Sequence, residues 1–335
     1  MKAVAYSIKP FEREFLAKAN QKKHDITLIS NALSPDTAVY AEGKEAVIVS
    51  TNDGVSAFVI EKLAALGIKY IATRSVGTNH IDKESAASHC IKLANVPYYP
   101  PQAIAEHAVA LAFALNRQLP KADRHAHHFD FRNDDLIGFN FTGKTVGIIG
   151  LGDTGKAAAQ LFSGLGCRVV GYDQFFPEDL KGVTSETLPD LLAQSDIISL
   201  HLPLTASTTH LINKGTIGMM KDGVMLINTS GAAVIKTTDV RDALKTGKIG
   251  YLGLDAYEFE EGLFFESHED DLVKDELLKE LMKHPNVLIT PHQAYLTKEA
   301  LQEISNQTIK SLDQWQTSKC LGDACVCTKD CRQNP

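Results

Sequence analysis

Long apolar runs and clusters of basic residues are both scarce in this sequence. Charged residues follow the first apolar segment from Lys9 onwards and recur throughout the 335 residues, so no stretch approaches the roughly 20 consecutive apolar residues of a transmembrane helix. The 34 Lys and Arg are scattered and are outnumbered by 41 Asp and Glu, for a net charge of −7, whereas a nucleic-acid surface needs a concentrated basic face. We therefore expect a cytoplasmic protein with neither a membrane nor a nucleic acid as partner.

Cysteine is also scarce until the end of the chain. Cys90 and Cys167 stand alone, in contexts typical of inert thiols. The other four crowd a short segment: Cys320, Cys325, Cys327 and Cys331. Four thiols could bind zinc or pair as disulfides, but no two have the C-x2-C spacing of structural zinc sites, and no histidine lies nearby. We interpret the segment as a mobile, reduced tail and expect no metal site.

A dinucleotide-binding fingerprint lies in the middle of the chain. A buried strand runs into Gly150-x-Gly152-x-x-Gly155, and these glycines open an alanine-rich helix. Gly150 makes the tight turn, Gly152 leaves no Cβ between backbone and pyrophosphate, and Gly155 lets the helix pack close to the strand. The helix N-terminus offers N–H groups and a positive dipole to the phosphates. The alternative is a glycine turn in an ordinary α/β protein.

The acidic residue that completes the fingerprint is Asp173, at the end of a second strand eighteen residues after Gly155. Its carboxylate is suited to bind the ribose hydroxyls and would repel a 2′-phosphate. Gln174 and Phe175 bring no positive charge to offset that repulsion. The predicted cofactor is therefore NAD(H) rather than NADP(H).

The position of the fingerprint predicts a second domain, because a simple Rossmann enzyme begins with this motif and 335 residues are typical of about two domains. Short buried strands alternate with helical segments in residues 1–98 as well, which is typical of a parallel sheet. The predicted strands are Lys2–Tyr6, Ile26–Ile29, Ala46–Val49, Tyr70–Ala72 and Lys92–Ala94, and the helices include Ser56–Leu66 and Lys83–His89. The apolar share of 44% is ample for two cores.

Two longer helices predict how the domains are connected. Ala- and Leu-rich sequence predicts a helix from near Gln102 to Asn116 with almost no polar face. Such a helix is suited to join domains and to form a subunit interface, so we expect a homodimer or homotetramer. Helical spacing of apolar residues predicts another helix over Lys298–Trp315, crossing back to the first domain.

The predicted fold class is therefore α/β, with two Rossmann-like, doubly wound parallel-sheet domains. An NAD-binding domain of residues 100–297 is inserted in a discontinuous catalytic (substrate) domain, which is formed by residues 1–99 and by residues 298–335 with the cysteine-rich tail.

Short motifs along the chain resemble those of the D-2-hydroxyacid dehydrogenase family, in the same order. Besides the glycines of residues 150–155 they are Arg74–Asp82, Ala103–Ala108, Ser199–Pro203, Met225–Ser230, Gly253–Glu260 and Thr290–Thr297. Within the family the chain is similar to the fermentative D-lactate dehydrogenases, through Gly262–Glu266 and His292–Thr297, and the resemblance reaches about residue 318. It implies reversible, NAD-dependent reduction of pyruvate to D-lactate.

The best candidate for the proton donor of such a reaction is His292. Reducing a 2-oxo acid needs a proton at the carbonyl oxygen, a hydride at C2 and groups that hold the carboxylate. His292 follows the predicted buried strand Asn286–Ile289 in a Pro-His turn, and imidazole titrates near neutral pH. A carboxylate partner would raise its pKa and fix its tautomer, and the resemblance implies that this partner is Glu260. An ordinary surface or core histidine is the alternative for His292 taken without its motif.

The resemblance also implies the binding residues. For the substrate they are the amides of Val76 and Gly77, in a turn suited to an anion nest, with Tyr99 and Tyr295 as pocket walls. For the coenzyme, beside the glycines and Asp173, they are Asp153, Thr154, Leu202, Pro203, Thr208, Thr229, Ser230 and Asp255, the last receiving the carboxamide. For Thr208 and Tyr295 the alternatives of a polar loop residue and a core residue stay open.

At Gly231 the chain departs from the family pattern. After Asn-Thr-Ser the family places an arginine, which clamps the substrate carboxylate and carbonyl, but this chain reads Asn228-Thr-Ser-Gly231-Ala232. Lys236 lies five residues further on, too far to assume that it replaces the arginine. Three interpretations stay open: an enzyme of weak or altered activity, an active enzyme deliberately inactivated, or an NADH-binding relative without turnover.

Overall fold

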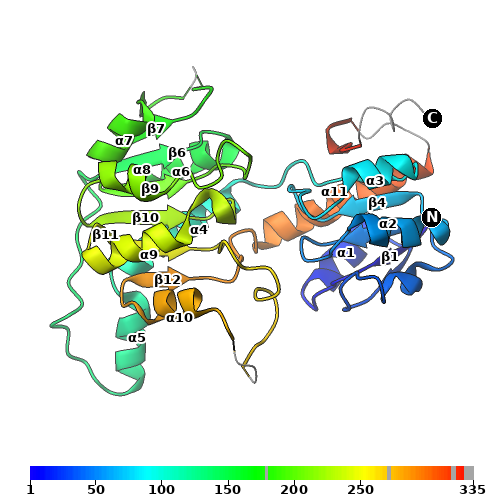
Figure 1. Cartoon of the computed structure of the whole chain (residues 1–335), viewed down its shortest axis with the longest axis horizontal. Helices are drawn as coiled ribbons and strands as arrows, with labels where there is room; N and C mark the ends of the chain where they lie inside the picture. Colours follow the sequence, from blue (N-terminus) through cyan, green and yellow to red (C-terminus); the bar gives the residue numbers. More distant parts are fainter. Residues whose placement is uncertain (178–179, 270–272, 318–321, 328–335) are drawn as a thin grey trace. The chain divides into compact units, whose positions relative to one another are not determined.

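The computed structural model describes residues 1–177, 180–269, 273–317 and 322–327. The chain divides into two compact units, one formed by Met1–Pro100 with Leu296–Pro335 and the other by Pro101–Tyr295. Each unit is built on one parallel sheet, of five strands in the first and seven in the second (Figure 1). The predicted fold class is confirmed.

The first unit has a sheet of order β2-β1-β3-β4-β5 in which every pair is parallel. Successive strand side chains point to opposite faces: one face packs on α2 and α3, and the other packs on α1 and α11. The elements are β1 (Lys2–Ala5), α1 (Glu12–Asn20), β2 (Asp25–Leu28), the 3-10 helix η1 (Ala38–Ala41), β3 (Ala46–Val49), α2 (Ala57–Ala65), β4 (Tyr70–Thr73), α3 (Lys83–Ser88), β5 (Lys92–Ala94), α11 (Lys298–Gln316) and the 3-10 helix η3 (Gly322–Ala324).

Helix α11 confirms the helix predicted over Lys298–Trp315. Thr297 caps it by accepting a hydrogen bond from the Ala300 amide. Ile309 and Trp315 are buried in the core that the sheet shares with α1, and the Trp315 ring stacks on Tyr70 with 4.8 Å between ring centroids. The helix therefore completes the first unit.

The interpretation of the cysteine-rich segment as a mobile tail is wrong for residues 322–327. Cys325 pairs antiparallel with Ala94 at the edge of β5, and Val326 N donates to Leu93 O at 3.2 Å. The segment satisfies backbone groups that an edge strand otherwise leaves unpaired. Cys325 and Cys327 pack with opposite cores, as alternate residues of a strand do. Cys320 and Cys331 lie outside the described residues.

The second unit has a sheet of order β12-β11-β10-β9-β6-β7-β8, again with parallel pairs throughout. Helices α4 and α6 pack on one face, and α7, α8, α9 and α10 pack on the other. The elements are α4 (Gln102–Asn116), α5 (Leu119–His127), β6 (Thr145–Ile149), α6 (Asp153–Gly164), β7 (Arg168–Tyr172), β8 (Val183–Ser185), α7 (Leu188–Gln194), β9 (Ile197–Leu200), α8 (Lys214–Met219), β10 (Val224–Asn228), the 3-10 helix η2 (Ala232–Val234), α9 (Thr237–Thr246), β11 (Ile249–Leu254), α10 (Glu276–Lys283) and β12 (Val287–Ile289).

Strands β6 and β9 are neighbours, and the connection that leaves β6 runs towards β7 and β8 whereas the one that leaves β9 runs towards β10, so the two run to opposite sides of the sheet. This is the topological switch point at which doubly wound proteins bind ligands, beyond the carboxyl ends of the strands. The fold thus places the glycine-rich turn after β6 at the expected position for a dinucleotide.

Helix α4 has its predicted bounds, but its low polarity has a cause inside the second unit. Ala105, Ala108 and Leu111 are buried in a core shared with α6 and the sheet. The composition of α4 is therefore explained without a partner subunit and does not by itself indicate a subunit interface.

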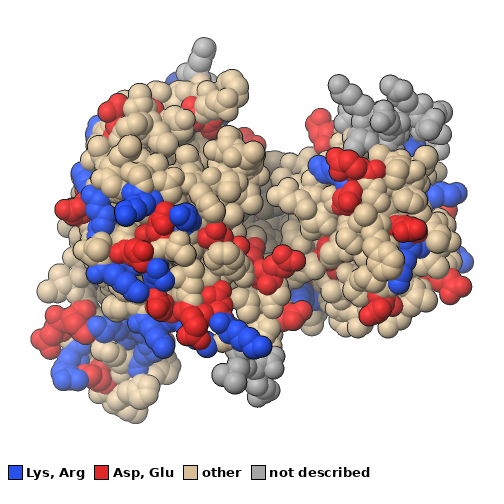
Figure 2. Space-filling view, in the orientation of Figure 1, with Lys and Arg blue, Asp and Glu red and all other residues tan. Residues whose placement is uncertain are grey.

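Charges of both signs are interspersed over the face shown in Figure 2. Several form surface ion pairs, such as Lys245 with Glu280 at 3.1 Å. Among the described residues, no helix is both long and apolar enough for a membrane span.

Candidate active site

The glycine-rich turn joins β6 to α6 and requires its glycines. Gly150 has φ 92°, and a Cβ there would collide with the carbonyl oxygen of His201. A Cβ at Gly155 would collide with the carbonyl oxygen of Gly150, whereas nothing lies near a Cβ at Gly152. Two of the glycines thus permit the tight packing of the turn, and the third leaves one side of it open.

Asp173 follows β7 and contacts the same turn. One carboxylate oxygen accepts a hydrogen bond from Leu151 N at 2.6 Å, and the other accepts from Phe175 N at 3.0 Å. A carboxylate has about four acceptor positions, so lone pairs remain for ribose hydroxyls. The contact of Asp173 with the ribose stays a prediction. In the structure, Asp173 also holds the glycine-rich turn in place through Leu151 N.

The residues predicted along the coenzyme differ in how their side chains are occupied. Thr208 donates to the Pro203 carbonyl at 2.6 Å and closes the loop after β9. The Ser230 hydroxyl donates to Asn228 at 2.9 Å. The Thr229 hydroxyl is buried with no hydrogen-bond partner among the described residues, and a buried polar group without a partner is costly unless a ligand or water satisfies it.

These residues fit a nicotinamide dinucleotide. Asp153 and Thr154 are the first two residues of α6, so their amides belong to the N-terminal turn of a twelve-residue helix, where N–H groups and dipole favour phosphate. With the open side at Gly152, the acid at Asp173 and the unsatisfied Thr229 hydroxyl, the site has a group for each part of the coenzyme.

His292 and Glu260 lie together, although 32 residues separate them in the sequence. His292 Nδ1 is 2.9 Å from Glu260 Oε1, and its side chain is 38% exposed. A carboxylate at Nδ1 holds the proton on that nitrogen and leaves Nε2 to face a substrate. His292 has a left-handed backbone with φ 51°, which is uncommon for a residue other than glycine.

Asp255 holds that backbone in place. Its carbonyl accepts from His292 N at 2.8 Å, and its buried carboxylate accepts from Gln293 N at 2.9 Å and from Ala294 N at 2.8 Å. The Thr290 hydroxyl donates to the same carboxylate at 2.6 Å. Asp255 therefore anchors the turn that carries His292, and its predicted contact with the carboxamide stays a prediction.

His107, which the sequence reasoning did not single out, completes this anchor. From α4 its Nε2 lies 3.0 Å from Thr290 Oγ1 and 3.3 Å from Asp255 Oδ1. A signal for it was present, because it is the one histidine of a largely apolar helix, and polar groups on such a helix need partners when they are buried. Its partners, however, lie about 150 to 180 residues away in the sequence.

The electrostatic surroundings favour a charged His292. Burial alone would lower its pKa, but the hydrogen bond and charge of Glu260 and the charge of Asp255 outweigh burial and raise the pKa above the ordinary 6.5. For Asp255, burial alone would raise the pKa, but hydrogen bonds from His107, Thr290 and two backbone amides outweigh it and lower the pKa. A proton donor and a stable anion thus lie side by side.

Phe265 is a further neighbour that sequence reasoning missed. Its ring centroid lies 5.6 Å from that of His292, and its φ is 71°. The apolar ring covers one side of the imidazole. Such burial removes water from the imidazole and by itself lowers the His292 pKa.

Val76 and Gly77 lie in the first unit, in the exposed turn after β4. Asn95 Nδ2 donates to Val76 O at 2.8 Å, and Ser75 Oγ donates to Gly77 O at 2.7 Å. Both carbonyls are thereby tied down, while within the described residues neither amide donates to another protein group. Consecutive amides without partners are suited to bind an anion.

Tyr99 and Tyr295 are both half-buried, Tyr99 in the first unit and Tyr295 at the end of the second. Their roles as walls of a substrate pocket stay predictions.

The segment at Gly231 packs closely against the loop after β9. Gly231 N donates to Leu202 O at 3.3 Å. A Cβ at Gly231 would lie 2.9 Å from Leu204 Cβ and 3.0 Å from Leu204 N, so any larger residue requires that loop to move. The ammonium of Lys236, five residues further on, pairs with Asp239 at 3.4 Å.

Fold and site together define a nicotinamide-nucleotide-dependent dehydrogenase. Residues 109–294 match the family model described as D-isomer specific 2-hydroxyacid dehydrogenase, NAD binding domain. The chain belongs to this family, and its cofactor is NAD.

Full-length relatives agree with this assignment. The chain is 40% identical to a D-lactate dehydrogenase of Escherichia coli over 93% of its own length and 96% of the relative's. It is 36% identical to an aromatic 2-oxoacid reductase of Clostridium sporogenes, over 98% and 100% of the two chains. A solved structure described as the pyruvate reductase of Chlamydomonas reinhardtii superposes with a TM-score of 0.93 at 39% identity, covering 96% and 98%.

Proposed function

We propose that this protein is an NAD-dependent D-lactate dehydrogenase that reversibly reduces pyruvate to D-lactate, with an efficiency lowered by glycine at position 231. The observation that carries the proposal is the His292–Glu260 pair, 2.9 Å apart, in the unit that holds the NAD turn. Relatives named for lactate, pyruvate and aromatic 2-oxo acids support the reaction class.

In this proposal His292 acts as a general acid. Bound NADH supplies the hydride to C2 of the substrate. The His292 imidazolium gives its Nε2 proton to the carbonyl oxygen, so that the ketone becomes a hydroxyl group and the imidazole becomes neutral. Glu260 stabilises the imidazolium and keeps the other proton on Nδ1. In the reverse direction the neutral imidazole takes the hydroxyl proton.

The first unit is proposed to be the substrate domain. The amides of Val76 and Gly77 would bind the substrate carboxylate, and Tyr99 and Tyr295 would line the pocket. Two amides provide partial charges, whereas a guanidinium provides a full charge and a bidentate grip. Losing one half of a desolvated charge pair costs about 2–5 kcal/mol, which is roughly thirty- to several-thousand-fold in catalytic efficiency.

The missing guanidinium favours a second candidate function, an NADH-binding protein without turnover. The test is NADH oxidation with pyruvate, with chiral analysis of the lactate and with aromatic and branched 2-oxo acids in parallel. Formation of D-lactate that is lost in His292→Gln supports the proposal. NADH binding with no oxidation by any 2-oxo acid supports the second candidate, and faster turnover of another 2-oxo acid reassigns the substrate.

A homodimer or homotetramer is part of the proposal, and a cytoplasmic location stays a prediction. Beyond α5, Phe129, Phe131 and Ile137 are 85%, 76% and 83% exposed. Large apolar side chains so exposed within one segment are typical of an interaction surface, and a second copy of the chain is the proposed occupant. Light scattering of the native protein and of Phe129→Ser/Phe131→Ser tests this, and a native monomer would contradict it.

A further inference from the structure

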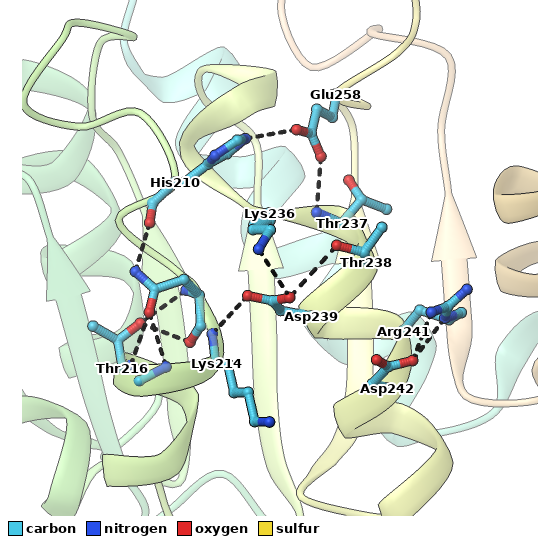
Figure 3. Close-up of polar contacts among 12 residues, drawn as sticks. His210, Lys214, Thr216, Lys236, Thr237, Thr238, Asp239, Arg241, Asp242 and Glu258 are labelled. Carbon is cyan, nitrogen blue, oxygen red and sulfur yellow. Dashed lines mark hydrogen bonds and ion pairs between the residues drawn. The ribbon is translucent and has the colours of Figure 1, made fainter.

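Glu258 lies between three segments of the second unit that carry predicted site residues (Figure 3). They are the loop after β9, the segment that leads from β10 into α9, and the turn after β11 that reaches Glu260. The Glu258 side chain is only 11% exposed, and each carboxylate oxygen has a partner from a different segment. A largely buried carboxylate with both oxygens engaged fixes the groups around it.

The first oxygen binds the loop after β9. Glu258 Oε1 lies 2.6 Å from His210 Nε2. His210 has a left-handed backbone with φ 53°, a conformation that surrounding contacts must hold. Its amide donates to Ala233 O at 2.8 Å, and its carbonyl accepts from Asn213 Nδ2 at 2.8 Å. The pair thereby ties the loop that contains Thr208 to the turn after β11, and the His210 amide ties the same loop to the segment after β10.

The second oxygen caps helix α9. Glu258 Oε2 accepts a hydrogen bond from Thr237 N, the first residue of the helix, at 2.8 Å. The N-cap residue, Lys236, makes no side-chain cap and pairs with Asp239 instead (Figure 3). The Glu258 charge also lies at the positive end of the helix dipole. Glu258, which lies in the turn after β11, therefore caps α9 in place of a side chain at the N-cap position.

The turn at residues 257–260 carries this constraint to Glu260. Glu260 N donates to Tyr257 O at 3.0 Å, and Tyr257 N donates to Glu260 Oε2 at 3.0 Å. Glu258 lies inside that turn, and the second oxygen of Glu260 faces His292. The charged groups that face His292 are Glu260 and Asp255. Glu258 is not among them, so any influence on His292 passes through Glu260.

We infer that Glu258 is a positioning residue, which fixes the turn at residues 257–260 to the loop after β9 and to α9 and so holds Glu260 against His292. The inference deepens the proposed function, because it assigns a residue to the machinery of the same site. It also connects the coenzyme loop, through His210, to the proton donor.

The test is the titration of His292 in the coenzyme-free protein, followed by NMR of the imidazole C–H signals and assigned with His292→Gln. Glu258→Ala removes both anchors, so the turn relaxes and the His292 titration moves to lower pH, by about half a unit to one unit. Glu258→Gln keeps an acceptor for Thr237 and a partner for His210 but removes the charge. Since Glu258 does not face His292, Glu258→Gln should leave the titration within about a fifth of a unit.

Fluorescence titration with NADH measures whether Glu258 also affects coenzyme binding through the loop after β9. Glu258→Ala and His210→Ala should each weaken NADH binding severalfold, and Glu258→Gln should weaken it much less. Neither readout requires turnover, so they stand even if the protein reduces no 2-oxo acid. An unchanged His292 titration in a folded Glu258→Ala protein would overturn the inference. So would equal shifts in Glu258→Ala and Glu258→Gln, because they would show a direct effect of charge rather than position.

Discussion

The surroundings of His292 and the surroundings of Gly231, both in the second unit, differ in how complete they are. Around His292, Glu260 binds Nδ1, and Asp255 holds the turn through four hydrogen bonds that include one to its own carbonyl. Position 231 carries no side chain, and the loop of Leu204 packs against the glycine. The hydrogen bonds around His292 do not involve Gly231, so the two regions can be tested separately.

The largest expected effect is the loss of catalytic efficiency when His292 is replaced. His292→Gln keeps a side chain that can bind Glu260 but cannot give a proton as an acid, so kcat/KM for pyruvate should fall by about 10²–10⁴-fold. NADH affinity, measured by fluorescence, should hardly change. His89→Gln, at an exposed position in the first unit, is the control. If NADH binding is lost together with turnover, His292 is a structural residue and the comparison fails.

The next effect concerns the coenzyme turn. NADH should bind about a hundredfold more tightly than NADPH or better, because a 2′-phosphate beside the Asp173 carboxylate costs several kcal/mol. Asp173→Asn keeps an acceptor for Leu151 N and removes the charge, so it should narrow the ratio without unfolding the turn. Calorimetric titration with both coenzymes measures it. Equal affinities of the parent protein for the two coenzymes would show that Asp173 does not face the ribose.

A substitution at Gly231 is expected to have a smaller effect on catalytic efficiency. Gly231→Arg should raise kcat/KM for pyruvate by at least about tenfold, because it returns a charged clamp to a site that has its donor and coenzyme turn. The gain should be divided between KM, as carboxylate binding, and kcat, as alignment of C2.

The matched control is Gly231→Ala, because any Cβ there must displace Leu204. The alanine variant should lower thermal stability and gain no activity. The guanidinium's contribution is then the difference between the arginine and alanine variants. If the two variants have the same kcat/KM, another group already holds the carboxylate, or the pocket does not take a 2-oxo acid.

Local patterns were predictable from sequence because their causes lie within a few residues. The turn at Gly150 needs a positive φ and a missing Cβ, and glycine is the residue that supplies both. The strands of the first sheet, strands β6, β7 and β12 of the second, and helices α4 and α11 follow from local apolar patterns in the same way. The resemblance to the family also shows, from the sequence alone, that Gly231 occupies the position of the usual arginine.

Contacts between distant segments were not predictable in this way. That His107 meets Asp255, or that Glu258 caps α9, depends on how parallel strands are ordered in the sheet. The polar, glycine-containing composition of the cysteine-rich segment predicts a mobile tail, yet its backbone at Cys325 pairs with the edge of β5. Backbone pairing leaves little trace in side-chain pattern.

The smallest expected effect concerns the pH dependence that the His292–Glu260 pair gives to the reaction. In the proposed reaction, reduction needs protonated His292, and Glu260, with a further contribution from Asp255, raises the His292 pKa against the opposing effect of burial. In Glu260→Gln burial is no longer outweighed to the same extent, so the His292 pKa falls, and the alkaline limb of kcat/KM for pyruvate moves to lower pH by about one unit. Below both pKa values His292 is protonated in either protein, so the ratio of parent to variant rates should be smallest in acid and should grow as pH rises through the limb. Glu261→Gln, at the exposed neighbouring position, should leave the profile unchanged. A limb that stays in place in Glu260→Gln would mean that the observed pKa belongs to another group, and that the 2.9 Å contact orients His292 without setting its charge.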